Sequence, residues 1–307
     1  MKDNQASYTA MSVAYMRAYH SIHATDKIFD DFLAYDLIPE ENRALIEQHL
    51  IEYYLSKKSN NSEQATPLSN QITISLHFMK VMNNVISRAR YTEDTLEKAF
   101  RQGVKQYVIL GAGMDTFAFR KPEMMGHLEV FEVDHPATQE FKLLRIAELG
   151  WKHPAKLHFI PIDFTKESLV TALTGSSSYD SKVKSFFSWF GVTPYLTQEE
   201  VFATLRSIAE VTPAGSTIVF DYYDTDAFAP EKMSSQMQES VKFLLKIGEP
   251  MKNGGFNPST LAEDLANLGF RLHENLSPAD IEGRYFKGCM DGYHTDEHVH
   301  FACAVTE

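Results

Sequence analysis

The stretch from Gln106 to Arg120 joins an apolar run to a glycine turn, a pattern typical of a strand that ends at a cofactor. It reads QYVILGAGMDTFAFR, and the run Tyr107 to Leu110 stops at Gly111, Ala112 and Gly113. A glycine turn after a buried strand lets the backbone come close to a bound nucleoside or nucleotide. Any doubly wound fold can carry such a turn without a ligand, so other residues must identify the chemistry.

Asp134 is the second candidate, at the end of the next apolar run. It follows Leu128 to Val133, roughly twenty residues after Gly111, where an acidic side chain can accept hydrogen bonds from a ribose diol. We include His135, the next residue, among the candidate cofactor-binding residues. A purely structural alternative is that Asp134 caps the helix expected after Pro136.

Asp163 and Phe164 form the third candidate position, after the predicted strand Leu157 to Pro161. A carboxylate can accept from an exocyclic amine, and an aromatic ring can cover a flat base. Asp163 could instead serve a turn or a helix cap. Ligands in open α/β sheets lie outside the carboxyl ends of the strands, so we expect the three positions to surround one nucleoside-shaped ligand.

The residues after the glycines help to choose between cofactors. A dinucleotide site favours a third glycine and a helix N-terminus for the pyrophosphate, whereas this turn continues as Met114-Asp115-Thr116. Asp115 places a negative charge where phosphate oxygens would lie. The pattern therefore favours a nucleoside with an amino-acid tail over NAD or FAD, with the tail ammonium donating to backbone carbonyls and its carboxylate binding an arginine.

Strands alternating with helices from residue 105 onward are expected to position these residues. Such alternation predicts an α/β fold, a doubly wound and mostly parallel seven-stranded sheet with helices on both faces. We expect the last strand, which alternates in polarity, to be less buried and close to an edge. The predicted strands are Tyr107 to Leu110, Leu128 to Val133, Leu157 to Pro161, Val183 to Phe190, Thr217 to Tyr223, Arg271 to Asn275 and Val299 to Val305. The predicted helices are Ala137 to Leu149, Lys166 to Leu173, Gln198 to Val211 and Pro258 to Leu268.

Residues 1–104 are expected to form a helical N-terminal cap, part of the same domain as the core at residues 105–307. Helical periodicity covers Asp26 to Leu37, Arg43 to Leu55 and Ile72 to Phe100. The polar segment Ser56 to Asn70 is predicted to be a surface loop. The long connection at about residues 224–255 is interpreted as a lid-like insertion.

Composition excludes several classes of protein. The formal net charge of −12 would repel a phosphate backbone, so we expect no nucleic-acid partner. Two cysteines, Cys289 and Cys303, and the absence of a long apolar run indicate a cytoplasmic protein without a membrane partner. His294, His298 and His300 lack a completing ligand pattern and are interpreted as surface histidines, so no metal is expected.

The motifs together resemble the leucine carboxyl methyltransferase-like class I S-adenosylmethionine-dependent methyltransferases. Within them, the chain is similar to the bacterial branch typified by the tetracenomycin polyketide O-methyltransferase. The combination of LGAGMDT with FEVDHP is the most specific part of the resemblance. The other matching pieces are TAMSVAYMRAYH, DKIFDDF, SRARYTED, FIPIDF and SWFGVTPYLTQEEVFATLRSIAE.

The resemblance implies a role for each matching residue, with S-adenosylmethionine as cofactor and S-adenosylhomocysteine as product. Arg17 falls in the N-terminal motif that closes over the cofactor. Phe190 stands where the family usually has a glutamate, and Phe117 where an arginine is common. The implied cofactor contacts are Arg88 for the methionine carboxylate, Gly111 and Gly113 for the amino-acid end, Asp134 for the ribose, and Asp163 with Phe164 for the adenine.

We therefore predict an O-methyltransferase acting on a carboxyl or hydroxyl oxygen of a small, polyketide-like molecule. A carboxylate acceptor needs no general base whereas a hydroxyl acceptor does, and the catalytic residues stay unknown. Tyr195, Tyr222, Tyr223 and His294 are candidates for the acceptor pocket. The alternatives are a dinucleotide-dependent oxidoreductase and a catalytically inactive relative that binds the cofactor. The cap and the insertion suggest enclosure, which disfavours a protein substrate.

Overall fold

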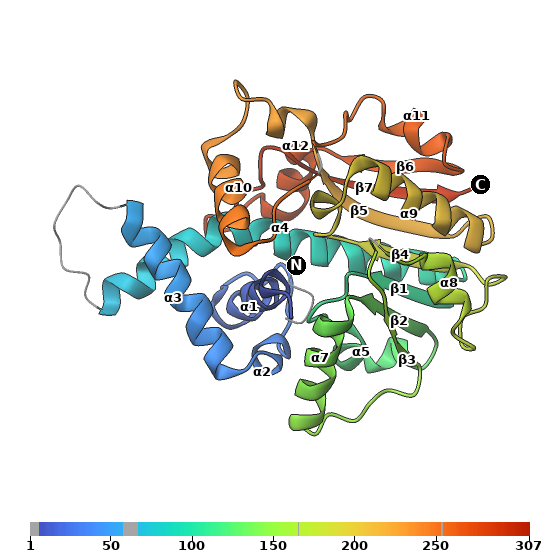
Figure 1. Ribbon diagram of the computed structural model, residues 1–307. Helices are drawn as coiled ribbons and strands as arrows, with labels where there is room; N and C mark the ends of the chain where they lie inside the picture. Colours follow the sequence, from blue (N-terminus) through green and yellow to red (C-terminus); the bar gives the residue numbers. More distant parts are fainter. Residues whose placement is uncertain (1–5, 58–66, 165, 253) are drawn as a thin grey trace.

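A seven-stranded mixed sheet forms the centre of the computed structural model, which describes residues 6–57, 67–164, 166–252 and 254–307 (Figure 1). The strand order is β3-β2-β1-β4-β5-β7-β6, and only β7 runs antiparallel to its neighbours. This confirms the predicted doubly wound, mostly parallel α/β sheet. The strands are β1 (Gln106–Leu110), β2 (Glu129–Asp134), β3 (Leu157–Pro161), β4 (Ser185–Trp189), β5 (Thr217–Tyr223), β6 (Phe270–Leu276) and β7 (Val299–Thr306).

The direction in which strands are added to the sheet reverses between β1 and β4. Strands β2 and β3 extend the sheet on one side of β1, whereas β4 and β5 extend it on the other. At such a reversal the two connections leave the sheet in opposite directions, and a crevice opens at the carboxyl ends of the strands. The glycine turn follows β1 directly, so this topology places it at the crevice.

Both faces of the sheet are covered by helices, because the side chains of each strand alternate between two apolar clusters. Val108 and Leu110 of β1 face the cluster that includes α8 (Leu169–Thr174), α9 (Gln198–Val211) and α11 (Leu261–Ala266). Tyr107 and Ile109 face the opposite cluster. That second face is covered by α4 (Pro67–Arg101), α5 (Phe117–Arg120), α6 (Pro122–Met125), α12 (Pro278–Ile281) and the π-helical turn Glu282–Phe286.

The N-terminal region is helical, with one departure from expectation. Its helices are α1 (Tyr8–His23), α2 (Ala34–Leu37), α3 (Glu40–Lys57) and α4. In Figure 1, α1, α2 and α3 lie beside the sheet, whereas α4 runs along one of its faces. The helix predicted over Asp26 to Leu37 is wrong except for α2. Two side chains of α1 accept hydrogen bonds from backbone amides of this segment, which a helix would use for its own hydrogen bonds. His20 Nε2 accepts from the amide of Ile28 at 3.0 Å, and Ser21 Oγ accepts from that of Asp31 at 2.6 Å.

The predicted polar loop Ser56 to Asn70 is shorter at both ends than expected. Ser56 and Lys57 end α3, and residues 67–70 begin α4. Residues 58–66 lie outside the described residues.

The insertion between β5 and β6 contains a short 3-10 turn (Thr225–Phe228) and the helix α10 (Ser235–Ile247). Its two ends meet in a backbone bridge between Asp224 and Phe256. The remaining helix, α7 (Pro136–Glu148), follows β2. In the described part of the chain, no helix combines the length and apolar character that crossing a membrane requires.

The last strand is buried, so the expectation of a less buried, edge-like strand was wrong. β7 pairs with β5 on one side and with β6 on the other. The prediction of surface histidines was also wrong for His298 and His300, which are each 7% exposed. The carboxylate of Asp224 lies 3.0 Å from His298 Nδ1 and 3.5 Å from His300 Nε2. Their burial follows from the strand order, which places the antiparallel strand inside the sheet.

We predict that His20 makes the fold sensitive to acid. Burial lowers the pKa of His20 to about 4, because the charged ring would lose its hydration. The Nε2 of its neutral ring accepts from the amides of Ile28 and Phe29. In the unfolded chain a histidine binds a proton near pH 6.5, whereas the folded chain resists protonation of His20 until about pH 4. The free energy of unfolding therefore falls by about 2 kcal/mol as the pH drops from about 6.5 towards 4. Urea unfolding at pH 7 and pH 4.5 should show a smaller loss in His20→Gln than in the wild type.

The matched control for that measurement is His127→Gln, because His127 is exposed. This variant should keep the pH dependence of the wild type. An equal acid sensitivity in His20→Gln and the wild type would contradict the prediction.

Candidate functional site

One cavity of about 660 Å³ lies at the carboxyl ends of the central strands. It collects residues from β1, β2 and β4 and from the turn after β3, together with α1 and α4, which are far apart in sequence. Every residue proposed from the sequence as a cofactor contact lines it. These residues are Arg88, Gly111, Ala112, Gly113, Asp134, His135, Asp163 and Phe164.

The glycine turn is held against the end of β2. The amides of Gly111 and Ala112 both donate to the carbonyl oxygen of Val133, at 2.8 and 3.2 Å. Gly111 has a φ of +71°, and a Cβ there would lie 2.3 Å from Cγ2 of Val192. The position therefore requires glycine for both its backbone conformation and its space.

Asp134 connects the glycine turn with the start of α7. Its Oδ2 accepts from the amide of Gly113, and its Oδ1 accepts from the amide of His135 at 2.6 Å. Burial raises the pKa of Asp134 above its ordinary value, and these two amides oppose that effect. Each carboxylate oxygen keeps a further lone pair for a ligand hydroxyl.

The helix-capping role that was the alternative for Asp134 is performed by His135 instead. The ring Nδ1 of His135 accepts from the amide of Ala137 at 3.3 Å, which makes His135 the N-cap of α7. Asp134 is thus left to hold the turn and to face the cavity.

Asp163 and Phe164 lie in a turn that also forms a wall of the cavity. The backbone carbonyl of Asp163 accepts from the amides of Lys166 and Glu167, both at 2.9 Å, and its carboxylate lies 2.9 Å from Lys166 Nζ. The structural reading as a turn is therefore correct. Because both residues line the cavity, the predicted adenine contact is compatible with that turn.

Arg88 faces the cavity from α4 and is held by a carboxylate of β5. Its Nη1 lies 3.2 Å from Oδ2 of Asp221, and Oδ1 of Asp221 accepts from the amide of Gly191 at 2.8 Å. Arg90, two residues further along α4, is half exposed and pairs with Asp94 at 2.8 Å. Of the two arginines, Arg88 is the one that the fold directs to the site.

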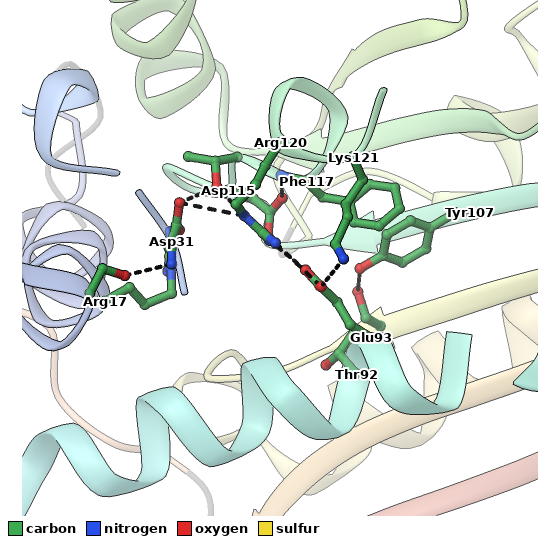
Figure 2. A network of polar contacts seen from close by, with 12 residues as sticks. Arg17, Asp31, Thr92, Glu93, Tyr107, Asp115, Phe117, Arg120 and Lys121 are labelled. Carbon is green, nitrogen blue, oxygen red and sulfur yellow. Dashed lines mark hydrogen bonds and ion pairs between the residues drawn. The ribbon is translucent and has the colours of Figure 1, made fainter. Parts of the chain in front are cut away.

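A buried ion-pair network joins the N-terminal helices to the glycine turn (Figure 2). Asp31, 1% exposed, pairs with Arg17 Nε at 2.8 Å and with Arg120 Nε at 3.6 Å. Arg17 also donates through Nη2 to the backbone carbonyl of Met114 at 2.7 Å. Arg17 is therefore fastened to the residue after the glycines, consistent with its predicted place over the cofactor.

The network continues to α4 through Glu93. The guanidinium of Arg120 donates to both carboxylate oxygens of Glu93, and Lys121 Nζ lies 3.6 Å from the same carboxylate (Figure 2).

Phe117, noted as a departure from the family pattern, is 1% exposed and meets Tyr107 edge to face, with the ring centroids 5.0 Å apart. Its ring helps to pack α5 against β1.

A second cavity of about 490 Å³ adjoins the first and is walled by α1, α3, α4 and α10. Arg88, Gly191 and Tyr195 line both cavities. Of the residues proposed for an acceptor pocket, Tyr195 and Tyr223 line this second cavity.

Two of the proposed acceptor-pocket residues, Tyr222 and His294, do not line this cavity. The Tyr222 side chain belongs to the apolar core on the α9 face, and its hydroxyl donates to Asn275 Oδ1 at 2.9 Å. His294 is 75% exposed and lies 3.0 Å from Glu282. Neither lines the cavity, because β5 alternates its side chains between faces and His294 belongs to an outer loop.

Sequence reasoning missed Asp221, Asp31 and Arg120. Asp221 had a signal, since it is the only charged residue in the strand TIVFDYY. A lone carboxylate inside an otherwise apolar strand has to be paired when the strand is buried. Asp31 and Arg120 carried no comparable signal. Within the residues that the structure describes, no group of three or more His, Cys, Asp or Glu side chains could hold a metal ion.

Comparison with known proteins gives a family match over most of the chain. Residues 10–209 match the model of the family described as leucine carboxyl methyltransferase. A relative from Bacillus subtilis, named "Putative S-adenosyl-L-methionine-dependent methyltransferase YktD", is 37% identical over 305 residues, which cover 99% of each chain.

Solved structures support the fold. A DUF574 family protein from Streptomyces avermitilis superposes with a TM-score of 0.60 at 11% identity, over 99% of each chain. A Thermobifida fusca protein described as a "putative methyltransferase" gives a TM-score of 0.56 at 13% identity, over 100% of this chain and 96% of that one. The seven-stranded sheet with N-terminal helices is the class I methyltransferase architecture.

We predict that Asp31→Ala destabilises the protein by about 3 kcal/mol, because it leaves Arg17 buried without its partner and weakens the hold on Arg120. Chemical unfolding followed by circular dichroism measures the change. The matched control is Asp30→Ala, since Asp30 is 47% exposed and pairs with the exposed Lys27. This control should change stability by less than about 1 kcal/mol. Equal effects of the two variants would contradict the prediction.

Proposed function

The chain belongs to the leucine carboxyl methyltransferase family, and from this membership we propose that it transfers a methyl group to an oxygen atom of a small molecule. The cofactor is S-adenosylmethionine, and the product formed from it is S-adenosylhomocysteine. One observation carries the assignment of the site: all eight candidate contacts line a single cavity at the reversal point of the sheet.

The lining of that cavity fits the three parts of the cofactor. Asp134, Asp163 and Phe164 line the cavity, and we assign the carboxylate of Asp134 to the ribose hydroxyls and the other two residues to the adenine. The glycine turn and Arg88 are left for the amino-acid end. When bound, the cofactor supplies an activated methyl group on its sulfonium.

The chain's own contribution to the reaction is alignment of the two reactants and exclusion of water. The N-terminal helix α1 contributes Thr9 and Val13 to both cavities. The insertion helix α10 adds Phe243 and Leu244 to the second cavity. Both segments therefore cover the junction at which methyl transfer would take place.

The second cavity is proposed to hold the methyl acceptor. Its walls are aromatic. The ring centroid of Tyr8 lies 6.5 Å from that of Phe243 and 5.3 Å from that of His49. Such a lining suits a small, largely apolar ring compound, in keeping with a polyketide-like acceptor and with the tetracenomycin-like branch. A protein substrate would need an open groove instead. We further propose that the enzyme works in the cytoplasm, without a nucleic-acid or membrane partner.

Either a carboxyl or a hydroxyl oxygen is compatible with this proposal. A carboxylate acceptor is already nucleophilic, whereas a hydroxyl must lose a proton. His49 is an imidazole in the acceptor cavity, and its Nδ1 lies 2.9 Å from the Tyr8 hydroxyl. We assign no catalytic base, since the position of the acceptor decides whether His49 is used.

The inactive-relative alternative rests on Phe190, which stands where the family has a glutamate. In the structure this side chain packs edge to face against Tyr91 and Phe301, with ring centroids 6.2 and 5.7 Å apart. The carboxylate of Asp221 lies beside the following residue, Gly191, so a charged partner is still present at this strand end.

Calorimetry with S-adenosylhomocysteine tests the cofactor site. We expect the wild type to bind and Asp134→Ala to bind about 10- to 100-fold more weakly, because charge-assisted hydrogen bonds to the ribose are lost. The control Glu263→Ala changes an exposed residue of α11 and should bind like the wild type. No binding to the wild type, or unchanged binding to Asp134→Ala, would overturn the assignment.

Tritiated S-adenosylmethionine with a library of phenols and aromatic carboxylic acids tests the acceptor cavity. We expect label in at least one compound. For that compound, Phe243→Asp should lower kcat/KM about tenfold or more, because a charge enters an apolar wall. Leu245→Asp is the matched control, on the same helix but 66% exposed. Transfer to no compound would favour the inactive relative.

A further inference from the structure

The end of β4 differs from the family pattern and raises the question of which side chain organises the amino-acid end of the cofactor. Phe190 lines the first cavity but carries no polar group. The residue after it, Gly191, has a φ of +68° and lies at the junction of the two cavities. A polar side chain that fixes the Gly191 backbone at this junction must therefore come from another strand.

Asp221 of β5 reaches the junction from the neighbouring strand. It is 6% exposed, and its two carboxylate oxygens are engaged by different partners, Arg88 at 3.2 Å and the amide of Gly191 at 2.8 Å. Its backbone carbonyl accepts from the hydroxyl of Thr193 at 2.8 Å. One buried aspartate thus ties α4, the end of β4 and the turn after it to β5.

The guanidinium of Arg88 is fixed from two sides. Asp221 holds Nη1, and a Cβ at Gly191 would lie 2.7 Å from Nη2, so the group packs directly against the Gly191 backbone. An arginine carries five N–H donors, and only one of them is used by Asp221. No other residue in the described part of the chain is seen to accept from Arg88, which leaves the remaining donors available for a carboxylate in the first cavity.

We infer that Asp221 is a positioning residue for the amino-acid end of S-adenosylmethionine: it holds Arg88 and the Gly191 turn in the orientation that receives the cofactor carboxylate. This inference rests on the proposed function of the cavity. It also explains how the site works with Phe190 in place of a glutamate. Asp221 lines the second cavity rather than the first, so it acts through Arg88 and not by touching the cofactor.

The inference predicts an effect confined to one part of the cofactor. 5′-Methylthioadenosine has the same nucleoside and thioether as S-adenosylhomocysteine but lacks the amino-acid tail. Loss of Asp221 should therefore weaken binding of S-adenosylhomocysteine and spare 5′-methylthioadenosine. A merely structural role for Asp221 would weaken both ligands alike.

The experiment is calorimetry of the full chain with both ligands. For Asp221→Asn, which keeps size and shape but loses the charge, we expect binding of S-adenosylhomocysteine to weaken about tenfold or more and that of 5′-methylthioadenosine to change less than about twofold. Arg88→Met should give the same pattern. Arg90→Met is the matched control on the same helix, because Arg90 is exposed, and it should change neither affinity.

The double variant Arg88→Met/Asp221→Asn provides a second measurement. If Asp221 acts through Arg88, the double variant should bind S-adenosylhomocysteine no more weakly than Arg88→Met alone. Fully additive losses would overturn the inference, since they would mean that Asp221 acts independently of Arg88.

A third variant, Asp221→Glu, covers the case in which Asp221→Asn does not fold. It keeps the charge opposite Arg88 but moves the carboxylate by one methylene, so it should retain binding of 5′-methylthioadenosine and bind S-adenosylhomocysteine more weakly than the wild type. Equal affinity of wild type and Asp221 variants for S-adenosylhomocysteine, or parallel losses for both ligands, would overturn the inference. Failure of the wild type to bind either ligand would instead refute the proposed function.

Discussion

The ion pairs of the buried Asp31 carboxylate with two arginines are the interaction on which the proposed cofactor site depends. Removing a charge from water is costly, and two arginines offset that cost here, one from α1 and one from α5. The hydroxyl of Thr116, at the end of the glycine turn, also donates to this carboxylate. These contacts connect the N-terminal region to the glycine turn, which follows the first strand of the sheet.

A second buried ion pair also fixes an N-terminal helix to the core. Arg88 of α4 pairs with Asp221 of β5, so the long helix α4 is fixed to the sheet near the place where β4 ends. Arg17 of α1 and Arg88 of α4 both line the first cavity, so the N-terminal helices contribute positive charge to it as well as cover.

The two cavities divide the site by chemistry. The first is lined by the glycine turn, Asp134 and the ends of parallel strands, all of which follow from the general architecture of the sheet. The second is built from α1, α3, α4 and α10, segments that are additions to that sheet. Under the proposed function, the strand ends of the shared core and the helices α1 and α4 would together bind the cofactor, whereas recognition of the acceptor would depend mainly on the added helices.

The sequence by itself determined the strands and the candidate cofactor contacts that follow them, because strand periodicity and a residue's place just after a strand are local properties. It predicted all seven strands near their observed bounds and brought Asp134 and Asp163 to one edge. Only the tertiary structure decided that β7 lies inside the sheet, which buries His298 and His300, and that Asp221 meets Arg88. Those results depend on strand order and on contacts between distant segments, which no local pattern encodes.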